Sequence, residues 1–292
     1  MHRIRGLIVS LFLLAAGGIS WAVAPLQAGK GSFVFETAQA ADNKPLTVWY
    51  YKPAGLKPDA RVLFVMHGVK RNGEKYRDDW IRYADQYKFL LIAPEFSEKY
   101  FPGDAYQFGN IKNPSFTEWS FMRIEQLFAE LKQAEGLQAD QYSLFGHSAG
   151  AQFVHRFMLF TPINKVDVAI AANAGTYTLP YYANAGEAGF PWSLDRKWVD
   201  ENQLKAVFGR KLWVLLGEAD IDPDHKHLSK KPAAMAEGAN RLERGKRFFA
   251  TAEKLAASLN TPLNWQLKTV PGVGHSDQGM AKAAARWLFE QR

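Results

Sequence analysis

The 292-residue sequence contains no cysteine. Disulfide bonds are therefore excluded, and so is anchoring through a lipid-modified cysteine. Internal repeats and low-complexity segments are also missing from the sequence. A chain of this length can bury a core large enough to fold without cross-links, as one large domain or two small ones.

The charge of the chain is only mildly one-sided. Lysine and arginine total 36 against 29 aspartates and glutamates, and the formal net charge is +7. The basic residues are spread out except at Lys226–Lys231 and Arg241–Arg247, which we interpret as solvated surface. This distribution gives no reason to expect a nucleic-acid partner, although it suits a protein exposed to anionic polymers.

The first residues are typical of an export signal. Met1–Arg5 is basic, and Leu7–Ala24 is apolar and uncharged. Two small-residue cleavage patterns follow, but Pro25 disfavours a cut after Ala24, so we predict cleavage after Ala28. The predicted product is a signal peptide, residues 1–28, and a mature chain, residues 29–292. Loss of Arg3 and Arg5 lowers the net charge to 7 − 2 = +5.

An uncleaved membrane anchor is the alternative interpretation of the same segment. The apolar run is close to the length that spans a bilayer, but Gly17, Gly18 and Ser20 interrupt it. We therefore favour cleavage, and expect a periplasmic or secreted protein without a stable membrane anchor.

Beyond this segment, apolar strand patterns alternate with helical patterns. The pattern first predicts an edge hairpin of two strands, Ser32–Glu36 and Leu46–Tyr51. Buried strands are then predicted at Arg61–Met66, at Phe89–Ala93, in the run that begins at Tyr142, and at Val166–Ala172, Lys211–Gly217 and Asn264–Val270. Helices are predicted at Arg77–Lys88, Phe116–Glu135, Ala151–Met158, Lys246–Leu259 and Gly279–Gln291. The predicted fold class is α/β, with a mostly parallel, doubly wound sheet and helices on both of its faces.

Two stretches interrupt this alternation. Thr176–Gly209 is rich in aromatics, glycine and proline, and we predict a small cap-like insertion over the C-terminal strand edge. Asp222–Gly245 is predicted to be a charged insertion. Sheets of this class place their functional sites at the carboxyl ends of strands, so the polar residues at those ends are the candidates for chemistry.

The most informative strand end is Gly146-His147-Ser148-Ala149-Gly150. This G-x-S-x-G pattern lies between a strand and an apolar helix, as a nucleophile elbow requires. A serine hydroxyl needs a base such as histidine, and the histidine needs an acid that orients its ring. His275 follows the last strand, and Asp220 follows the strand before it, in the chain order Ser, Asp, His.

With these motifs the sequence resembles an α/β-hydrolase from about Pro45 to the C-terminus. The matching pieces are H-G at 67–68, G-H-S-A-G at 146–150, G-E-A-D at 217–220 and P-G-V-G-H-S at 271–276. It is most similar to exported esterases of the polyhydroxyalkanoate-depolymerase and feruloyl-esterase type. The resemblance implies Ser148 as nucleophile, His275 as base and Asp220 as acid, with Asp222 as a competitor for the acid role.

The same resemblance implies an oxyanion hole made by the backbone N–H groups of Ala149 and Val69. Val69-Lys70 replaces the longer glycine run of some family members, so the identity of the second oxyanion-hole donor stays open. The implied reaction is hydrolysis of a small or polymeric carboxylic ester, without a cofactor or a metal. A serine peptidase or amidase, and a non-catalytic envelope binding protein, are the alternatives. The sequence does not indicate the oligomeric state.

The remaining polar and aromatic residues receive structural interpretations or stay open. We expect His67 to brace the oxyanion turn through a backbone hydrogen bond, His147 to pack beside the nucleophile, and His155 and Arg156 to be buried scaffold. Glu95 could contact substrate or form a salt bridge. The residues Asp222–His227 resemble a metal cluster, but neighbouring lysines argue against one. Pocket wall and loop anchor are equally compatible with the loop aromatics Tyr100, Phe101, Tyr106, Phe108, Tyr177, Tyr181, Tyr182, Phe190 and Trp192.

Overall fold

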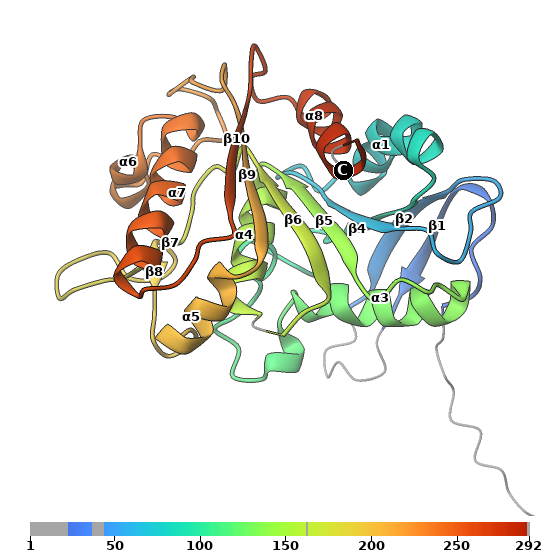
Figure 1. Ribbon diagram of the computed structural model, residues 1–292, viewed down its shortest axis with the longest axis horizontal. Coiled ribbons are helices and arrows are strands. Elements are labelled where there is room, and N and C mark those ends of the chain that lie inside the picture. Colours follow the sequence, from blue (N-terminus) through green and yellow to red (C-terminus); the bar gives the residue numbers. More distant parts are fainter. Residues whose placement is uncertain (1–22, 37–43, 162, 291–292) are drawn as a thin grey trace, which may run out of the picture.

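The computed structural model describes residues 23–36, 44–161 and 163–290, and its centre is an eight-stranded sheet (Figure 1). The strand order is β1-β2-β4-β3-β5-β6-β9-β10. The strands are β1 (Gly29–Phe35), β2 (Leu46–Lys52), β3 (Val62–Met66), β4 (Leu90–Glu95), β5 (Tyr142–His147), β6 (Val166–Ala172), β9 (Lys211–Gly217) and β10 (Gln266–Val270). β2 is antiparallel to both of its neighbours, β1 and β4. The other six strands, β4, β3, β5, β6, β9 and β10, are parallel to one another.

Helices cover both faces of this sheet, as the alternating pattern predicted. One face carries α1 (Gly73–Tyr87) and α8 (Asp277–Phe289), which lie side by side (Figure 1). The other face carries α3 (Met122–Glu135), α4 (Ala149–Phe160) and α7 (Arg241–Ser258). Successive residues of a strand point to opposite faces. Leu63 of β3 accordingly packs with Trp80 of α1, whereas Phe64 packs with Phe128 of α3.

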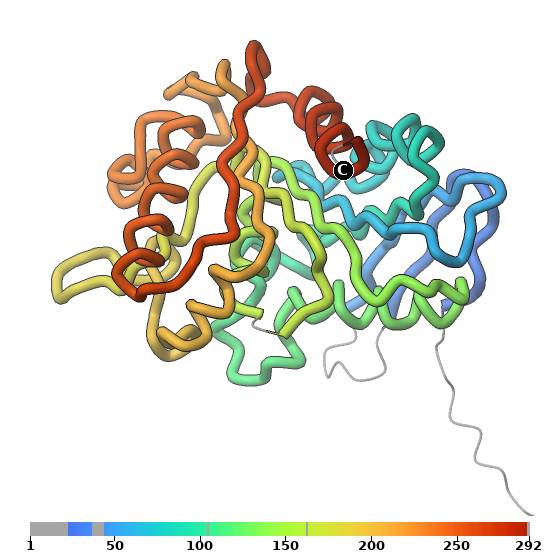
Figure 2. The backbone as a smooth tube through the Cα atoms, viewed as in Figure 1, coloured from blue at the N-terminus to red at the C-terminus, as the bar shows by residue number. Residues whose placement is uncertain are grey.

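The parallel strands bring the candidate residues to one edge. β9 and β10 are parallel and end at the top of the molecule, where the chain crosses to α8 (Figure 2). Two backbone hydrogen bonds join the loops that follow them, from Glu218 N to Val270 O at 3.1 Å and from Ala219 N to Val273 O at 3.0 Å. These bonds fix the segment that carries Asp220 against the segment that carries His275.

The helix boundaries differ from the sequence prediction by a few residues, and the helix predicted at Lys246–Leu259 already begins at Arg241. The helix predicted at 116–135 is a 3₁₀ turn, Phe116–Glu118, followed by α3 from Met122. α1 starts at Gly73, four residues before the predicted start, and Glu95 explains the difference. Its Oε2 accepts hydrogen bonds from Gly73 N and from Trp49 Nε1, both at 2.9 Å. A carboxylate at a helix N-terminus is favourable, so Glu95 belongs to the scaffold.

The interpretation of Arg241–Arg247 as solvated surface is wrong for two of its residues. Within the predicted charged insertion, α6 (Pro232–Glu237) forms and α7 begins at Arg241. Arg241 and Arg244 are only 1% and 0% exposed. Arg244 donates to the carbonyl oxygens of Gly175, Ser229 and Gly238, so its guanidinium joins three loops at the sheet edge.

The predicted insertion at 176–209 contains β7 (Leu179–Tyr182), β8 (Ser193–Leu194) and α5 (Glu201–Phe208). β7 and β8 pair with each other outside the main sheet, and β7 packs against α7. A short α2 (Asp104–Gln107) lies in the predicted loop 97–114 and packs on α4.

Most of the predicted signal peptide, residues 1–22, lies outside the described residues. Residues 23–28 lie against α3. The side chain of Leu26 is buried, and its backbone carbonyl accepts a hydrogen bond from Lys52 Nζ at 2.9 Å. A cut after Ala28 would remove this contact, so the position of cleavage bears on the packing of α3. None of the described helices is long and apolar enough to cross a bilayer.

Glu237 is a buried carboxyl group at the end of α6. Its Oε2 accepts a hydrogen bond from Tyr177 N at 3.0 Å. Burial raises the pKa of Glu237 from 4.5 to about 7, although the Tyr177 N–H and nearby arginines oppose the rise. The folded protein therefore binds this proton more tightly than the unfolded chain does. The contribution of Glu237 to the free energy of unfolding is therefore fully present below about pH 4.5, and it is lost as the pH rises towards 7.

We predict that Glu237→Gln removes this pH dependence, because glutamine keeps an acceptor for Tyr177 N and carries no charge. Between pH 5 and pH 8 the free energy of unfolding of the unsubstituted protein should fall by roughly 2 to 4 kcal/mol more than that of the variant. Denaturant unfolding at both pH values measures the difference. Equal losses in the two proteins would contradict the assignment.

Candidate active site

Ser148 lies in a strained turn between β5 and α4. Its φ and ψ angles are 59° and −116°, a region that non-glycine residues rarely adopt. The flanking glycines are required by close backbone contacts. A Cβ on Gly146 would lie 2.3 Å from Gly150 O, and a Cβ on Gly150 would lie 2.1 Å from Met66 O. The turn is therefore held between β3, β5 and α4.

Three residues that the sequence singled out form a continuous chain of hydrogen bonds. His275 Nε2 is 3.0 Å from Ser148 Oγ, and His275 Nδ1 is 2.7 Å from Asp220 Oδ2. An ionised carboxylate only accepts, so His275 donates from Nδ1 and leaves Nε2 to accept the Ser148 hydroxyl proton. Asp220 is buried, and His275 is partly exposed.

The competing acid, Asp222, does not reach His275. It is exposed and accepts a hydrogen bond from Asp224 N at 2.8 Å. Asn173 supports the arrangement from β6, because its side-chain amide donates to Gly274 O at 3.1 Å and accepts from Gly217 N at 2.8 Å. This buried asparagine ties the β9 end to the loop that carries His275.

Arg241 completes the surroundings of Asp220. Its Nη1 is 3.4 Å from Asp220 Oδ1, and both side chains are almost fully buried. Its Nη2 donates to His225 Nδ1 at 3.1 Å, and the His225 ring lies 5.0 Å from the His275 ring. Burial, with Arg241 adding to the effect, lowers the pKa of His225, which favours a neutral ring next to His275.

The predicted oxyanion donors lie on either side of Ser148. Ala149 is the first residue of α4, so its N–H has no intrahelical partner. Val69 lies in a turn closed by Arg71 N and Gly68 O at 3.1 Å, which leaves the Val69 N–H unused by that turn. A Cβ on Gly68 would be only 3.7 Å from Ser148 Cβ. The Gly68–Val69 turn therefore borders the space in front of Ser148.

His67 braces this turn through backbone hydrogen bonds, which confirms the structural role expected for it. Its Nε2 accepts from Phe96 N at 2.9 Å, so its Nδ1 is the donor to Gly68 O at 2.9 Å. Burial lowers the pKa of His67 to about 3, and the ring is neutral. Tyr106 stacks on the ring and donates its hydroxyl to His67 O at 2.7 Å.

His147 packs against the base, as expected. Its ring lies 4.6 Å from the His275 ring, and its Nδ1 is 3.1 Å from the hydroxyl of Tyr76. Burial lowers the pKa of His147 well below its usual value, so this ring adds no charge beside His275. His155 and Arg156 are buried and hydrogen-bonded to Thr178, which confirms their interpretation as scaffold.

Two neighbouring hollows lie at this edge of the sheet. The first, which we call the Ser148 hollow, has a volume of 300 Å³ and is lined by Ser148, His275 and Gly68 among others. The second, which we call the aromatic hollow, has a volume of 530 Å³ and is lined by Phe108, Phe190 and Trp192 among others. Lys226 and His227 line both hollows.

The loop aromatics therefore divide between the two interpretations left open by the sequence. Phe108, Phe190 and Trp192 line a hollow, whereas Phe101, Tyr106 and Tyr177 are buried anchors in the core. The Asp222–His227 loop is largely exposed. Across the described residues, no three histidine, aspartate or glutamate side chains are grouped to hold a metal ion.

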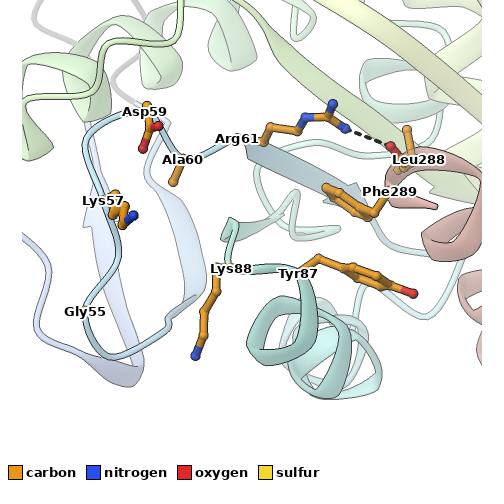
Figure 3. A pocket seen from close by; sticks show the side chains of 9 residues that line it. All are labelled: Gly55, Lys57, Asp59, Ala60, Arg61, Tyr87, Lys88, Leu288 and Phe289. Carbon is orange, nitrogen blue, oxygen red and sulfur yellow. Dashed lines mark hydrogen bonds between the residues drawn. The ribbon is translucent and has the colours of Figure 1, made fainter. Parts of the chain in front are cut away.

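A larger cavity of 600 Å³ lies elsewhere, between the start of β3 and the ends of α1 and α8 (Figure 3). Arg61 donates to Leu288 O at 2.7 Å across its wall, and Tyr87 and Phe289 lie beside it. This cavity is at the amino end of β3, whereas Ser148 follows the carboxyl end of β5. Its lining contains no serine, histidine or glutamate.

Known structures share this fold and cover nearly the whole chain. Poly(aspartic acid) hydrolase-1 from Sphingomonas sp. KT-1 is 40% identical, with a TM-score of 0.85, over 91% of this chain and 100% of that one. LpqC, a poly(3-hydroxybutyrate) depolymerase from Bordetella parapertussis, is 36% identical, with a TM-score of 0.83, over 91% and 92% of the two chains. The chain belongs to the α/β-hydrolase family.

This result confirms the family and the hydrolase class predicted from the sequence. A serine hydrolase of Staphylococcus aureus, FphF, shares the fold at 16% identity, with a TM-score of 0.56 over 89% of this chain and 98% of that one. No family model and no curated protein sequence matches the chain.

The most important residue that the sequence did not reveal in this hydrolase is Arg241. One signal was available, because Asn240 and Glu243 have the spacing of a helix start, and the Asn240 side chain does accept from Glu243 N at 3.0 Å. A helix that begins at Arg241 places this arginine at the end of α7 nearest Asp220.

We predict that Arg241→Met lowers the free energy of unfolding by about 3–5 kcal/mol, because Asp220 stays buried without its cation. kcat for a small ester should fall roughly tenfold to a hundredfold, with little change in KM, because Asp220 then orients His275 less well. Denaturant unfolding and steady-state kinetics measure both effects, and Arg241→Lys should restore part of each.

The matched control is Arg247→Met, an exposed arginine in the same helix. Its stability and kcat should stay close to those of the unsubstituted enzyme. If Arg241→Met behaves like this control, Arg241 does not support the Asp220 carboxylate.

Proposed function

We propose that this hydrolase is an exported enzyme that cleaves carboxylic esters through an acyl-enzyme intermediate. The observation that carries the proposal is the chain of hydrogen bonds from Asp220 through His275 to Ser148. Ser148 is the nucleophile, His275 the general base and Asp220 the acid that orients the ring. The resident chemistry uses side chains and backbone N–H groups alone.

The geometry supports ester hydrolysis in two stages, acylation of Ser148 and then release of the acyl group by water. As Ser148 Oγ attacks the ester carbonyl carbon, its proton passes to His275 Nε2, and Asp220 stabilises the imidazolium. The carbonyl oxygen becomes an oxyanion that accepts hydrogen bonds from Ala149 N and Val69 N. The imidazolium then returns the proton to the departing alkoxide. A water molecule, deprotonated by His275, then attacks the acyl carbon; the bond to Ser148 Oγ breaks, the imidazolium returns its proton to Oγ, and the acid leaves.

Hydrolysis of an amide is the second candidate, and one observation favours it. The relative that is 40% identical is a hydrolase of poly(aspartic acid), whose backbone is built from amide bonds. The relative that is 36% identical is a depolymerase of poly(3-hydroxybutyrate), a polyester. The same serine, histidine and aspartate serve both reactions, because protonation by His275 assists either leaving group.

Export is supported by the basic and apolar N-terminal segment and by relatives named for polymer substrates. We propose that residues 29–292 form the mature enzyme as one hydrolase domain with the insertion at 176–209. Mass determination of the N-terminus after secretion tests the cleavage point, and an intact Met1 in the secreted fraction would contradict it.

We predict that a fluorophosphonate probe labels the enzyme on Ser148. Ser148→Ala should abolish labelling, and His275→Ala should slow it by at least about three orders of magnitude, because the hydroxyl then lacks its base. Gel fluorescence and mass spectrometry of the labelled peptide measure the result. Ser258→Ala, at an exposed serine near the end of α7, is the control and should label normally. Folded protein that does not label would contradict the proposed function.

The choice of acid gives a separate prediction. Asp220→Asn should lower kcat by a factor on the order of 10⁴, because asparagine favours the wrong tautomer of His275. Asp222→Asn should keep activity within about twofold, because its carboxylate is exposed and bonds Asp224 N. Steady-state hydrolysis of a nitrophenyl ester measures both variants. Equal losses would assign the acid role to neither residue alone.

A further inference from the structure

The Ser148 hollow and the aromatic hollow are neighbours, and we call the two together the groove. Lys226 and His227 line both, so the aromatic hollow lies next to the Ser148 hollow on that side. There Phe108 and Trp192 offer flat apolar walls. The groove is therefore suited to an extended substrate rather than to a compact one.

The charges along this groove have one sign. Lys70, Lys75 and Lys226 line the Ser148 hollow, and Lys112, Lys226 and Lys231 line the aromatic hollow. Aspartate and glutamate are missing from the lining of the aromatic hollow, all of which is described. In the Ser148 hollow the single acidic residue of the lining is Asp277.

Asp277 does little to offset these lysines. Its side chain is largely buried, and its Oδ2 lies 3.9 Å from Nζ of Lys75, so any charge on it offsets that lysine and not the others. Burial and the neighbouring Asp79 carboxylate raise the pKa of Asp277 well above its usual range, which disfavours its charged form. Asp79 itself is paired with Lys75, so this part of the wall is close to neutral.

Four of the lysines have no internal counter-charge. Within the described residues, Lys70, Lys112, Lys226 and Lys231 form no ion pair, and all four are exposed. Lys230 provides the contrast in the same loop, because it pairs with Asp224 at 2.9 Å and lies outside both linings. Four exposed lysines without an ion pair among the described residues thus line the two hollows, while Lys230, outside both linings, is paired with Asp224.

We propose that the groove binds a chain that carries several ionised carboxylates, with its scissile bond at Ser148 and its next repeats along Lys226, Lys112 and Lys231. This inference rests on the proposed function for the position of the bond that is cut. A row of exposed ammonium groups without counter-charges attracts and orients a polyanion, and the effect weakens as salt screens it. A neutral polyester chain gains none of this attraction.

Binding to the Ser148→Ala enzyme tests the inference without turnover. Isothermal titration calorimetry with a deca-aspartate peptide should show binding at 50 mM salt that weakens at 300 mM salt. Lys112→Gln/Lys231→Gln should raise the dissociation constant roughly tenfold, because two exposed ionic contacts are lost. A water-soluble trimer of 3-hydroxybutyrate should bind more weakly than deca-aspartate.

Lys230→Gln is the control, to be compared with Lys231→Gln alone, since each removes one charge from the same loop and only Lys231 lines the groove. Lys230→Gln should change the dissociation constant less than twofold, and unchanged melting temperatures should show that the variants are folded. The inference is overturned if Lys231→Gln or the double variant binds deca-aspartate as tightly as the control does, or if the neutral trimer binds more tightly. Fluorophosphonate labelling of Ser148 in the unsubstituted enzyme separates this outcome from failure of the proposed function.

Discussion

The turn at Ser148 depends on three backbones that meet without room for a side chain. The carbonyl of Met66 in β3 contacts Gly150, and the carbonyl of Gly150 contacts Gly146 in β5. Because any Cβ would collide there, β3, β5 and α4 must pack at one fixed separation. The same constraint holds Ser148 in its positive φ conformation, and such strain persists only where the surroundings over-determine it. The sheet therefore positions the nucleophile through its central strands, not through the loop alone.

A second constraint follows from burying the carboxylate of Asp220. An isolated buried charge is costly, so Asp220 needs partners that stay in place. His275 supplies one from the loop after β10, and Arg241 supplies the other from the start of α7. The carboxylate thereby joins two parts of the chain to the end of β9. Two neutral histidines, His147 and His225, lie beside His275 without adding charge to it.

Much of this arrangement could be predicted from the sequence because it follows from local pattern. The central strands are continuous apolar runs, since both faces of the sheet are covered, and the elbow glycines stand at fixed spacing around Ser148. Asp220 and Asp222 could not be separated in that way, because both follow β9 and only the approach of the β10 loop decides between them. Arg241 was missed for a related reason. Its neighbours are charged, and its burial depends on a carboxylate 21 positions away.

The groove shows how the fold separates two electrostatic tasks. Next to His275 the rings of His147 and His225 are neutral and Arg241 is paired with Asp220, whereas Lys70 and Lys226 line the open side of the same hollow. Lys226, which lines both hollows, is the first of a row of exposed lysines that lack counter-charges among the described residues. Exposed ammonium groups keep most of their hydration, so this row costs little stability while it raises the local concentration of anions. Substrate charge would then be attracted to these exposed lysines, while the buried pair of Asp220 and Arg241 keeps the position of His275.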